Sequence, residues 1–501
     1  MSSDNGGIIG VVNDPTSTVA SGVWQQEEQY EAKVNGTWPQ RALFTTKSLR
    51  FDDGSSDYLT KSVSSTSNRR TFTYSTWVKR SNLSGSNYPR LFNPFVDSNN
   101  FFDVYFRNTD ALNIYSYSGG SNNIDLVTTQ LFRDVSAWYH IVLAVDTTQG
   151  TEANRVKLYV NGSQVTSFST STYPSQNADL QINVSGVTNV IGRNQSGTNN
   201  YFDGYMAEII LVDGSQLAPT SFGVTNSDGV WTPIIYSGTY GTNGFNLQFE
   251  NASALGTDSS SNGNNFTVNN LTSIDQSTDY PEVNFATLNP LIPSNGSTSN
   301  GNLDYATSNS SNNFGYRVST IGVSSGKFYA ECKYISGAWG YIGIRSFFTT
   351  TVSHQLGYYS DDYAILRDNG KIYNNNSGST YATSWSTGDI IGVALDCDNN
   401  KLYFSKNGQW SNGSGAWDST TFNSSVGDIT IGSASSSTNG AYFFACNNWD
   451  SSTNSSFSWN YGSPPYAISS GNTDGNGYGN FEYAVPSGYY ALNTANLAEF
   501  G

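Results

Sequence analysis

The chain is poor in charged residues, which make up 12% of its 501 residues, whereas a typical soluble domain has about 25%. Solvated helices usually expose Lys and Glu, so this shortage argues against a helical protein. The polar surface must instead come from Ser, Thr, Asn and Gly, which favour turns and short loops. Aromatic residues reach 14%, which suits pleated, half-buried surfaces and excludes an intrinsically disordered chain.

Cysteines and long apolar runs are also scarce. Cys332, Cys397 and Cys446 are odd in number and widely spaced, so they indicate neither a disulfide framework nor a zinc site. No N-terminal stretch joins basic residues to an apolar segment, and no run approaches the roughly 18 apolar residues of a membrane span. We therefore expect a protein that is made in a cytoplasm and is not inserted in a membrane.

Positive charge is in short supply as well, because the formal net charge is −16. Such a surface repels phosphate backbones, so we expect no nucleic-acid partner. The same repulsion argues against docking on anionic lipid. An acidic surface can recruit divalent cations, but composition alone does not show a site.

The first 42 residues (1–42) differ from the rest because they hold a helical pattern. Ser21–Lys33 starts with a capping serine, carries glutamates early and a lysine late, and is followed by an Asn-Gly pair and a proline. A helix this short is marginal in water, so it must pack on the next domain or on another protein. We favour docking to a partner, with Trp24, Tyr30 and Trp38 as the candidate anchoring side chains.

From about residue 43 the sequence reads as short strands separated by turns. Phe72–Val78 alternates between two faces, Trp138–Val145 is a β-prone run, and Arg155–Val160 ends at an Asn-Gly turn. A second series begins near Gly315 and contains a hairpin around Asp368-Asn369-Gly370. Further strands are expected at 48–51, 204–212, 244–250, 327–334, 341–344, 364–367, 390–395, 401–405 and 442–446.

This density of strands predicts an all-β protein with two antiparallel β-sandwich domains, jelly-roll-like, in tandem after a short segment that contains one helix. We expect four regions. They are a leader or anchor at 1–42, a first sandwich at 43–275, a second sandwich at 276–463 and a Gly- and Tyr-rich C-terminal tail at 464–501. The two halves share no repeat unit, so the pattern does not indicate a solenoid or propeller.

Two sets of motifs occur in a fixed order along the chain. The first is SLRFDDGSSDYL (48–59), TFTYSTWVKR (71–80), AWYHIVLAVDTT (137–148), NRVKLYVNG (154–162), NVIGR (189–193) and FDGYMAEIILVDG (202–214). It resembles the laminin-G-like branch of the concanavalin-type lectin sandwiches. The second is SSGKFYAECKY (324–334), YIGI (341–344), LRDNGKIYNNN (366–376), GDIIGVALDCDNNKLYFSKNGQW (388–410) and SFSWNYG (456–462). It resembles the SPRY domain, another two-sheet sandwich.

The order of the parts is more specific than either part. A leader with GIIG and VASGVWQQEEQYEA, the two sandwiches and the ending NFEYAVPSGYYALNTANLAEFG resemble large virion-associated proteins of marine bacteriophages, including those that infect cyanobacteria. The resemblance implies a component of the virion surface, such as a tail fibre, spike or capsid decoration, made in the host bacterial cytoplasm. It also implies a leader that contacts other virion proteins and a homo-oligomer, for which a trimer is one candidate.

Catalytic motifs are missing from the sequence. Glycosidases of the concanavalin type often carry Glu-x-Asp-x-x-Glu along one strand, because two carboxylates must flank the scissile bond. Here Glu208 and Glu331 each stand alone on a strand. His140 and His354 lack a nucleophile elbow, and no phosphate or dinucleotide loop is present. We expect no catalytic residues and a protein that is not an enzyme.

Calcium is the one cofactor that the resemblance brings into consideration. Laminin-G-like domains often hold calcium at the sandwich rim through loop carboxylates, and calcium takes several oxygen ligands. The candidate ligands are Asp52, Asp53 and Asp57 in one acidic loop and Asp203 in a turn. The competing interpretation is a solvated turn, which we favour because no ligand motif matches.

A binding site is the remaining candidate for function. Aromatic rings pack against the apolar faces of sugars, while Asn, Asp and backbone groups bind their hydroxyls. Loops at the ends of a sandwich carry such sites. The candidate glycan-binding residues are Tyr201, Phe202, Trp385, Trp410 and Trp449. The alternative is that these aromatics cap sheet ends or fill subunit interfaces.

These observations favour a non-enzymatic protein of the virion surface that binds glycans on the host cell. Two alternatives stay open. The first is a purely structural decoration or collar protein that stabilises the particle. The second is a polysaccharide depolymerase, against which the missing carboxylate pair argues.

Overall fold

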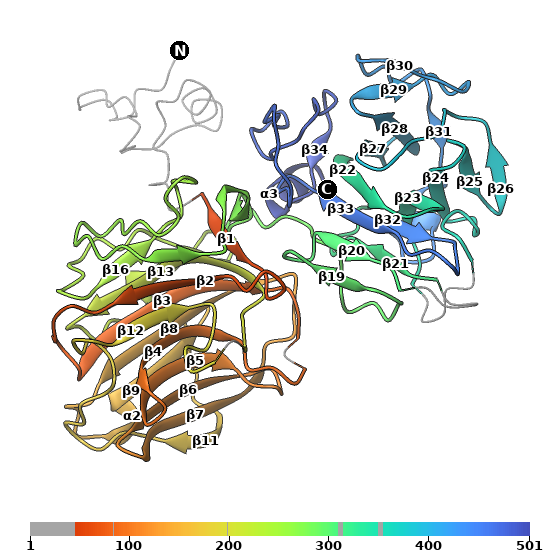
Figure 1. The fold of residues 1–501 in the computed structure, drawn as a ribbon. Coiled ribbons are helices and arrows are strands. Elements are labelled where there is room, and N and C mark those ends of the chain that lie inside the picture. Colours follow the sequence, from red (N-terminus) through yellow and green to blue (C-terminus); the bar gives the residue numbers. More distant parts are fainter. Residues whose placement is uncertain (1–45, 84, 198, 309–313, 349–353) are drawn as a thin grey trace, which may run out of the picture.

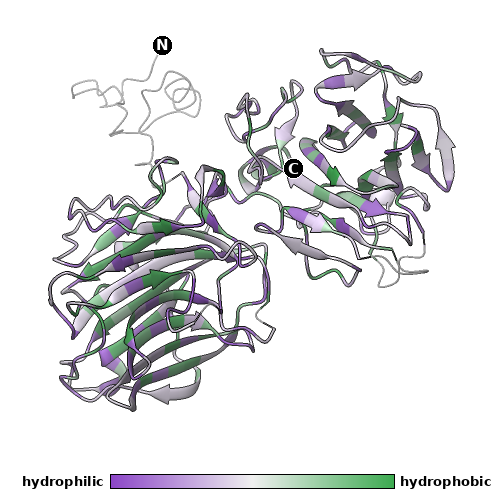
Figure 2. Ribbon diagram, viewed as in Figure 1, coloured by the Kyte–Doolittle hydropathy of each residue, from purple (hydrophilic) through white to green (hydrophobic). Residues whose placement is uncertain are grey.

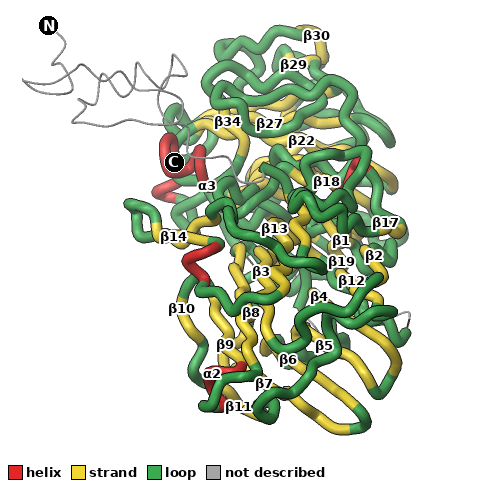
Figure 3. Tube along the Cα trace, turned by 90° about the vertical axis from the view of Figure 1, so that its left-hand side faces the viewer, coloured by secondary structure: helices red, strands yellow, loops and turns green. Residues whose placement is uncertain are grey.

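The computed structural model describes residues 46–83, 85–197, 199–308, 314–348 and 354–501. Within these ranges the chain forms two packed pairs of largely antiparallel sheets in tandem, which confirms the predicted all-β fold (Figure 1). Helices occur there only as short segments, drawn red in Figure 3. The predicted helix Ser21–Lys33, with Trp24, Tyr30 and Trp38, lies outside the described residues.

The first sandwich consists of two eight-stranded sheets, here called sheet A and sheet B. Sheet A has the order β10 (Ser163–Gln164), β9 (Val156–Val160), β8 (Trp138–Asp146), β3 (Thr71–Arg80), β13 (Gly204–Asp213), β1 (Ser48–Phe51) and β18 (Gln276–Ser277), with β16 (Phe245–Leu247) beside β13. Sheet B has the order β11 (Phe168–Thr172), β7 (Ser121–Leu131), β6 (Ala111–Ser118), β5 (Asn100–Phe106), β4 (Arg90–Asp97), β12 (Thr188–Ile191), β2 (Tyr58–Ser62) and β17 (Thr267–Asn269).

Short elements complete this domain at its edges. They are α2 (Glu152–Arg155), η2 (Pro219–Ser221), η3 (Ser273–Asp275) and the hairpin of β14 (Gly223–Thr225) and β15 (Trp231–Pro233). The core between the sheets follows the two-residue period of the strands. In β5, for example, Phe102, Val104 and Phe106 are fully buried in it. Figure 2 shows the resulting alternation of hydrophobic and hydrophilic residues along the strands.

The second sandwich consists of sheet C and sheet D. Sheet C has the order β19 (Ser297–Ser299), β20 (Asp304–Ala306), β33 (Ser456–Asn460), β22 (Lys327–Ser336), β27 (Ile390–Asp396), β28 (Lys401–Lys406), β29 (Gln409–Ser411) and β30 (Trp417–Ser419), with β31 (Ile429–Thr430) beside β28. Sheet D has the order β21 (Tyr316–Val318), β32 (Phe443–Asn448), β23 (Gly340–Arg345), β24 (Asp362–Leu366), β25 (Ile372–Asn374) and β26 (Ser377–Ser379). The turn η4 (Ala434–Ser436) precedes β32.

The C-terminal segment expected as a separate tail, 464–501, is packed on this second sandwich. Its strand β34 (Tyr490–Ala491) pairs in parallel with β22, and α3 (Thr494–Phe500) follows. Phe481 and Tyr489 are buried against Tyr403 and Trp410 of sheet C. The segment therefore covers the outer side of sheet C, because those apolar side chains must be shielded from water.

Buried polar contacts join the two sandwiches. The Lys79 ammonium of β3 donates to Asp279 Oδ2 at 2.8 Å, Asn284 Oδ1 at 2.7 Å and the carbonyl of Phe285 at 3.0 Å. These acceptors lie on the segment that follows β18. Because β18 pairs with β1, the first sandwich extends to Ser277. Lys79 and Asp279 are each 1% exposed.

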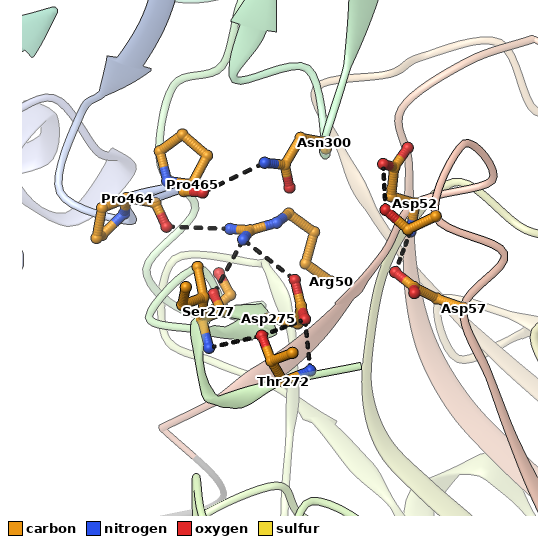
Figure 4. Close-up of polar contacts among 12 residues, drawn as sticks. Arg50, Asp52, Asp57, Thr272, Asp275, Ser277, Asn300, Pro464 and Pro465 are labelled. Atoms are coloured by element: carbon orange, nitrogen blue, oxygen red, sulfur yellow. Dashed lines mark hydrogen bonds and ion pairs between the residues drawn. The ribbon is translucent and has the colours of Figure 1, made fainter. Parts of the chain in front are cut away.

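A second contact centres on Arg50 of β1, which is also buried. Figure 4 shows its guanidinium between the carboxylate of Asp275 and the carbonyl of Pro464, to which it donates at 3.5 Å and 3.1 Å. Asn300 donates to the carbonyl of Pro465 nearby. Because buried charges need compensating partners, these contacts fix how the sandwiches meet.

Loss of the Lys79 ammonium should leave Asp279 buried without its counter-charge. We predict that Lys79→Met lowers the free energy of unfolding by about 3–5 kcal/mol in urea denaturation. Arg70→Met is the matched control, because the Arg70–Asp179 pair is 44% and 46% exposed and such pairs contribute below about 1 kcal/mol. Equal effects of the two substitutions would contradict the structural role of Lys79.

Candidate functional site

The outer side of sheet B carries a connected set of polar and aromatic side chains. A simple solvated strand face would instead carry scattered Ser and Thr. Core residues such as Val104 and Ile114 alternate with residues that point the other way. We call this outward set the sheet B face. It consists of Arg90, Asn93, Phe95, Phe101, Asp103, Tyr105, Asn113, Tyr115, Tyr117 and Asp125.

A buried carboxylate lies at the centre of the face. Asp103 is 2% exposed and accepts hydrogen bonds from Asn93 Nδ2 at 2.6 Å and Arg90 Nη2 at 3.3 Å. Burial raises the pKa of the Asp103 carboxyl to about 6, while the charge of Arg90 acts in the opposite direction. The contacts hold three strand positions in fixed geometry, because each partner would be unsatisfied without the others.

The network continues toward β7. The Arg90 guanidinium lies over the Tyr105 ring, 4.4 Å from its centroid. The Tyr105 hydroxyl donates to Asn113 Oδ1 at 2.7 Å, and Asn113 Nδ2 donates to Asp125 Oδ1 at 3.0 Å. This chain of contacts fixes the tilt of the Tyr105 ring and the direction of the Asp125 carboxylate.

Four further rings form a ladder on the same face. Phe95 contacts Phe101 with centroids 6.3 Å apart, and Phe101 lies 5.8 Å from both Tyr115 and Tyr117. All four are half-buried. The hydroxyl of Tyr115 donates to Asn122 Oδ1, and that of Tyr117 donates to the carbonyl of Gly120. The rings are thereby held at a fixed tilt with part of their surface open, which suits stacking against a flat apolar ligand surface.

An open pocket of about 520 Å³ adjoins the face at the β2 end. The Arg193 guanidinium lies 3.8 Å from the Tyr58 ring centroid and donates from Nη2 to Gln195 Oε1 at 3.0 Å. The backbone amide of Gln195 donates to Asn93 Oδ1 at 2.9 Å, so the pocket and the Asp103 network share Asn93. The pocket is lined by Tyr58, Thr60, Lys61, Ser62, Thr188, Arg193, Gln195, Asn265 and Thr267.

The two glycan-binding residues predicted in the first sandwich lie in different environments in the structure. Tyr201 is half-buried, and its ring lies 6.3 Å from that of Tyr58, beside the pocket. Phe202 is 1% exposed and packs on Phe51 inside the core. A buried ring cannot contact a surface ligand, so Phe202 is removed from the set and Tyr201 remains.

The three tryptophans of the second sandwich do not come together. Trp385 is 2% exposed and belongs to the core, so it too is removed from the set. Trp410 is 7% exposed and borders a small cavity of about 130 Å³ with Phe422. Trp449 is half-buried and packs on Phe314 at 4.1 Å. Trp410 and Trp449 therefore border separate places and do not build one site.

The predicted calcium ligands lie at the rim of the first sandwich. The Asp52 carboxylate accepts hydrogen bonds from the Gly54 amide and the Ser55 hydroxyl of its own loop. Asp57 Oδ2 accepts a hydrogen bond from the Asp52 amide at 3.0 Å (Figure 4). Asp57 and Asp203 are 2% and 5% exposed, so the solvated-turn interpretation is wrong for these two. Burial, reinforced by neighbouring carboxylates, raises the pKa of Asp57 to about 7 and that of Asp203 well above its usual range.

Two carboxylate oxygens at this rim have no hydrogen-bond partner. They are Oδ1 of Asp57 and Oδ1 of Asp203, both buried. Orphaned buried oxygens fit a cation ligand, because burial of an unpaired acceptor is costly. Across the described ranges, however, no three His, Cys, Asp or Glu side chains group closely enough to hold a metal by themselves. Backbone or water oxygens would have to complete a calcium shell.

The histidine in the first sandwich is placed for packing. His140 is fully buried and stacks on Trp77 at 4.5 Å. Its Nδ1 accepts from Trp231 Nε1 at 2.9 Å, which assigns the proton to Nε2, 2.9 Å from Ser75 Oγ. Burial lowers the pKa of His140 to about 3. An imidazole that donates to a serine cannot remove the proton of that serine, so the pair does not form a nucleophile and base.

The isolated Glu331 is also structural. It is fully buried, and burial raises its pKa to about 7. Its two oxygens accept from the backbone amides of Glu482 and Tyr483, the Tyr329 hydroxyl and Asn460 Nδ2. The carboxylate therefore docks the C-terminal segment on β22.

Sequence reasoning missed the strands that carry the sheet B face, β4 to β7. A signal was present in Asn100–Phe106, where Phe102, Val104 and Phe106 alternate with Phe101, Asp103 and Tyr105. The same alternation recurs in Ala111–Ser118. An aspartate between two aromatic residues on one strand face would have indicated a built polar surface.

Comparison with known proteins supports both domain resemblances. Residues 53–217 match the model of the concanavalin A-like lectin/glucanases superfamily, and residues 328–427 match that of the SPRY domain. A comparison with curated protein sequences found no match. The described residues include no helix with the length and apolarity to span a membrane.

The chain is also similar to solved structures. The SPRY domain of human HERC1 is 17% identical, over 34% of this chain and 96% of that chain, with a TM-score of 0.26. Stonustoxin is 18% identical, over 35% of this chain and 27% of that chain, with a TM-score of 0.25. The heptameric SAP-like pentraxin of Limulus polyphemus is 18% identical, over 32% of this chain and 71% of that chain, with a TM-score of 0.24.

The two family matches establish the kind of domain that each half contains. The first half has a laminin-G-type, concanavalin-like lectin domain, and the second half has a SPRY domain. Domains of these types suggest a role in binding or adhesion.

Proposed function

We propose that this chain is a non-enzymatic surface protein of a bacteriophage particle that binds polysaccharide on the host cell through the sheet B face. The observation that carries the proposal is the ladder of half-buried rings beside the Asp103 network. The virion assignment rests on the order of leader, lectin-like domain, SPRY domain and C-terminal ending in the sequence. In this proposal the leader contacts other virion proteins and the chain forms a homo-oligomer.

The chemistry of the face matches an extended carbohydrate. Sugar rings present C–H groups on one side, which pack on aromatic rings such as Phe101 and Tyr115. Their hydroxyls need hydrogen-bond partners, and Asp125 at the side of the ladder is half-buried. Because the ladder spans β4, β5 and β6, it offers contacts to successive sugars of a chain rather than to one sugar.

Hydrolysis is not part of the proposal, although two aspartates lie on the face. Asp103 and Asp125 both pair with Tyr115 in the strand register. Asp103 is buried and bonded to Arg90 and Asn93, and Asp125 accepts from Asn113. Asp103 is therefore not available as an acid or base, and Asp125 alone does not supply the two carboxylates that a glycosidase needs.

Loss of the rings tests the site. We predict that Phe101→Ala and Tyr115→Ala each weaken binding to host-type surface polysaccharide about fivefold, and that together they weaken it about 25-fold, from roughly 1 kcal/mol per ring. Binding is measured on an array of bacterial capsule and O-chain glycans. Tyr159→Ala is the matched control, because Tyr159 is a half-buried ring on sheet A.

Three outcomes would count against the proposal. No binding of the intact chain to any surface glycan would favour a purely structural decoration or collar protein. Binding that survives loss of both rings would place the site elsewhere. Release of reducing ends from a bound polysaccharide would establish a depolymerase.

We also propose that calcium binds at the rim, with Asp57 and Asp203 as ligands and backbone or water oxygens completing its shell. Asp52 and Asp53 add negative charge nearby. The two orphaned buried oxygens favour this. When bound, the cation would compensate the carboxylates that otherwise repel one another.

Calcium should therefore raise the melting temperature of EDTA-treated protein. A calcium concentration 100 times the Kd corresponds to about 2.7 kcal/mol of added stability. The shift should vanish in Asp57→Asn and persist in Asp179→Asn, which changes an exposed carboxylate of the same domain. An unchanged melting temperature in the unsubstituted protein would contradict the proposal.

A further inference from the structure

The pocket beside the sheet B face has an unusual charge for this chain. The whole chain carries a formal net charge of −16. The pocket lining nevertheless includes two cationic residues, Lys61 and Arg193, and no Asp or Glu. Its other lining residues are polar or aromatic, so the two cations dominate the local field.

Arg193 is held in place but not neutralised. Its guanidinium stacks on Tyr58, and one nitrogen donates to Gln195, an uncharged partner. Its Nε is buried and has no hydrogen-bond acceptor. The ion pairs found among the described residues do not involve Arg193. An arginine with a fixed plane and free N–H groups is suited to bidentate recognition of an anion.

Lys61 adds a second charge at the same pocket. Its ammonium donates to the carbonyl of Ser62 at 3.3 Å. Burial lowers the pKa of the Lys61 ammonium, and the charge of Asp258 acts in the opposite direction. Asp258 is buried, and its oxygens accept from Asn246 of β16 and from Ser260 and Asn264 of its own loop, so its charge is already compensated.

We infer that the pocket takes an acidic sugar residue, a uronate or a sulfated sugar, whose anionic group pairs with Arg193 and Lys61. The inference rests on the proposed glycan-binding function and specifies its ligand class. Asn93, which bonds both to Gln195 and to Asp103, links the pocket to the ring ladder. A polysaccharide lying along the ladder would therefore place one acidic residue in the pocket and neighbouring residues on the rings.

The test compares each acidic oligosaccharide with its own neutralised form. The probes are uronate hexamers and their methyl esters, and sulfated hexamers and their desulfated forms, measured by calorimetry with the full chain in EDTA. We expect at least one acidic probe to bind about tenfold more tightly than its neutral form, as charge-assisted hydrogen bonds predict. The difference in affinity between the acidic and neutral forms should decrease as the salt concentration is raised.

The double variant Arg193→Gln/Lys61→Gln should abolish the preference for acid and leave binding of the neutral forms unchanged. Retained neutral binding also shows that the variant is folded. Lys371→Gln is the matched control, because it removes one exposed positive charge from the second sandwich.

The failures of the two proposals are distinguishable. Neutral forms that bind as tightly as the acids would overturn the inference and leave glycan binding intact. A preference for acid that survives in the double variant would overturn the assignment to this pocket. No binding by any acidic or neutral probe would overturn the proposed function and the inference together.

Discussion

The geometry of the candidate site depends on one buried carboxylate. Asp103 accepts from Arg90 on one side and Asn93 on the other, across two strands of sheet B. Through Arg90 it fixes the Tyr105 ring, and through Asn93 it is linked to the loop that holds Arg193. Burying such a charge is costly, so the folded state needs both partners beside it. The site is thus built into the fold, not added on a mobile loop.

Buried carboxylates that accept several hydrogen bonds recur throughout the described part of the molecule. Asp213, Asp258, Asp474 and Glu331 each accept four hydrogen bonds, many from backbone amides of loops. A chain with long connections leaves many amides outside sheet ladders, and buried amides must be satisfied. A carboxylate offers about four acceptor positions, so one acid can order a whole turn. This explains why an acidic chain with few charges can still bury several of them.

Strands with long apolar runs could be predicted from the sequence. The strands that carry the polar sheet B face were not predicted. Trp138–Asp146 and Ile390–Asp396 have hydrophobic residues on both faces, so they stand out without structural knowledge. In β4 and β7 extra residues at bulges shift the register, which interrupts the two-residue period on which such predictions depend. Phe202 and Trp385 lie next to turns, and sequence cannot tell whether a ring beside a turn enters the core. Tyr201 and the acidic loop could be singled out as candidates because turn residues and acids are local signals.

We propose that the chain binds carbohydrate on the sheet B face of the lectin-like domain. The decisive experiment is hydrogen–deuterium exchange of the full chain, with and without the surface polysaccharide that it captures. We predict slower amide exchange in Arg90–Asp97, Asn100–Phe106 and Ala111–Ser118 and around Arg193, with no change in the SPRY domain. Protection confined to the loops of the second sandwich would contradict it.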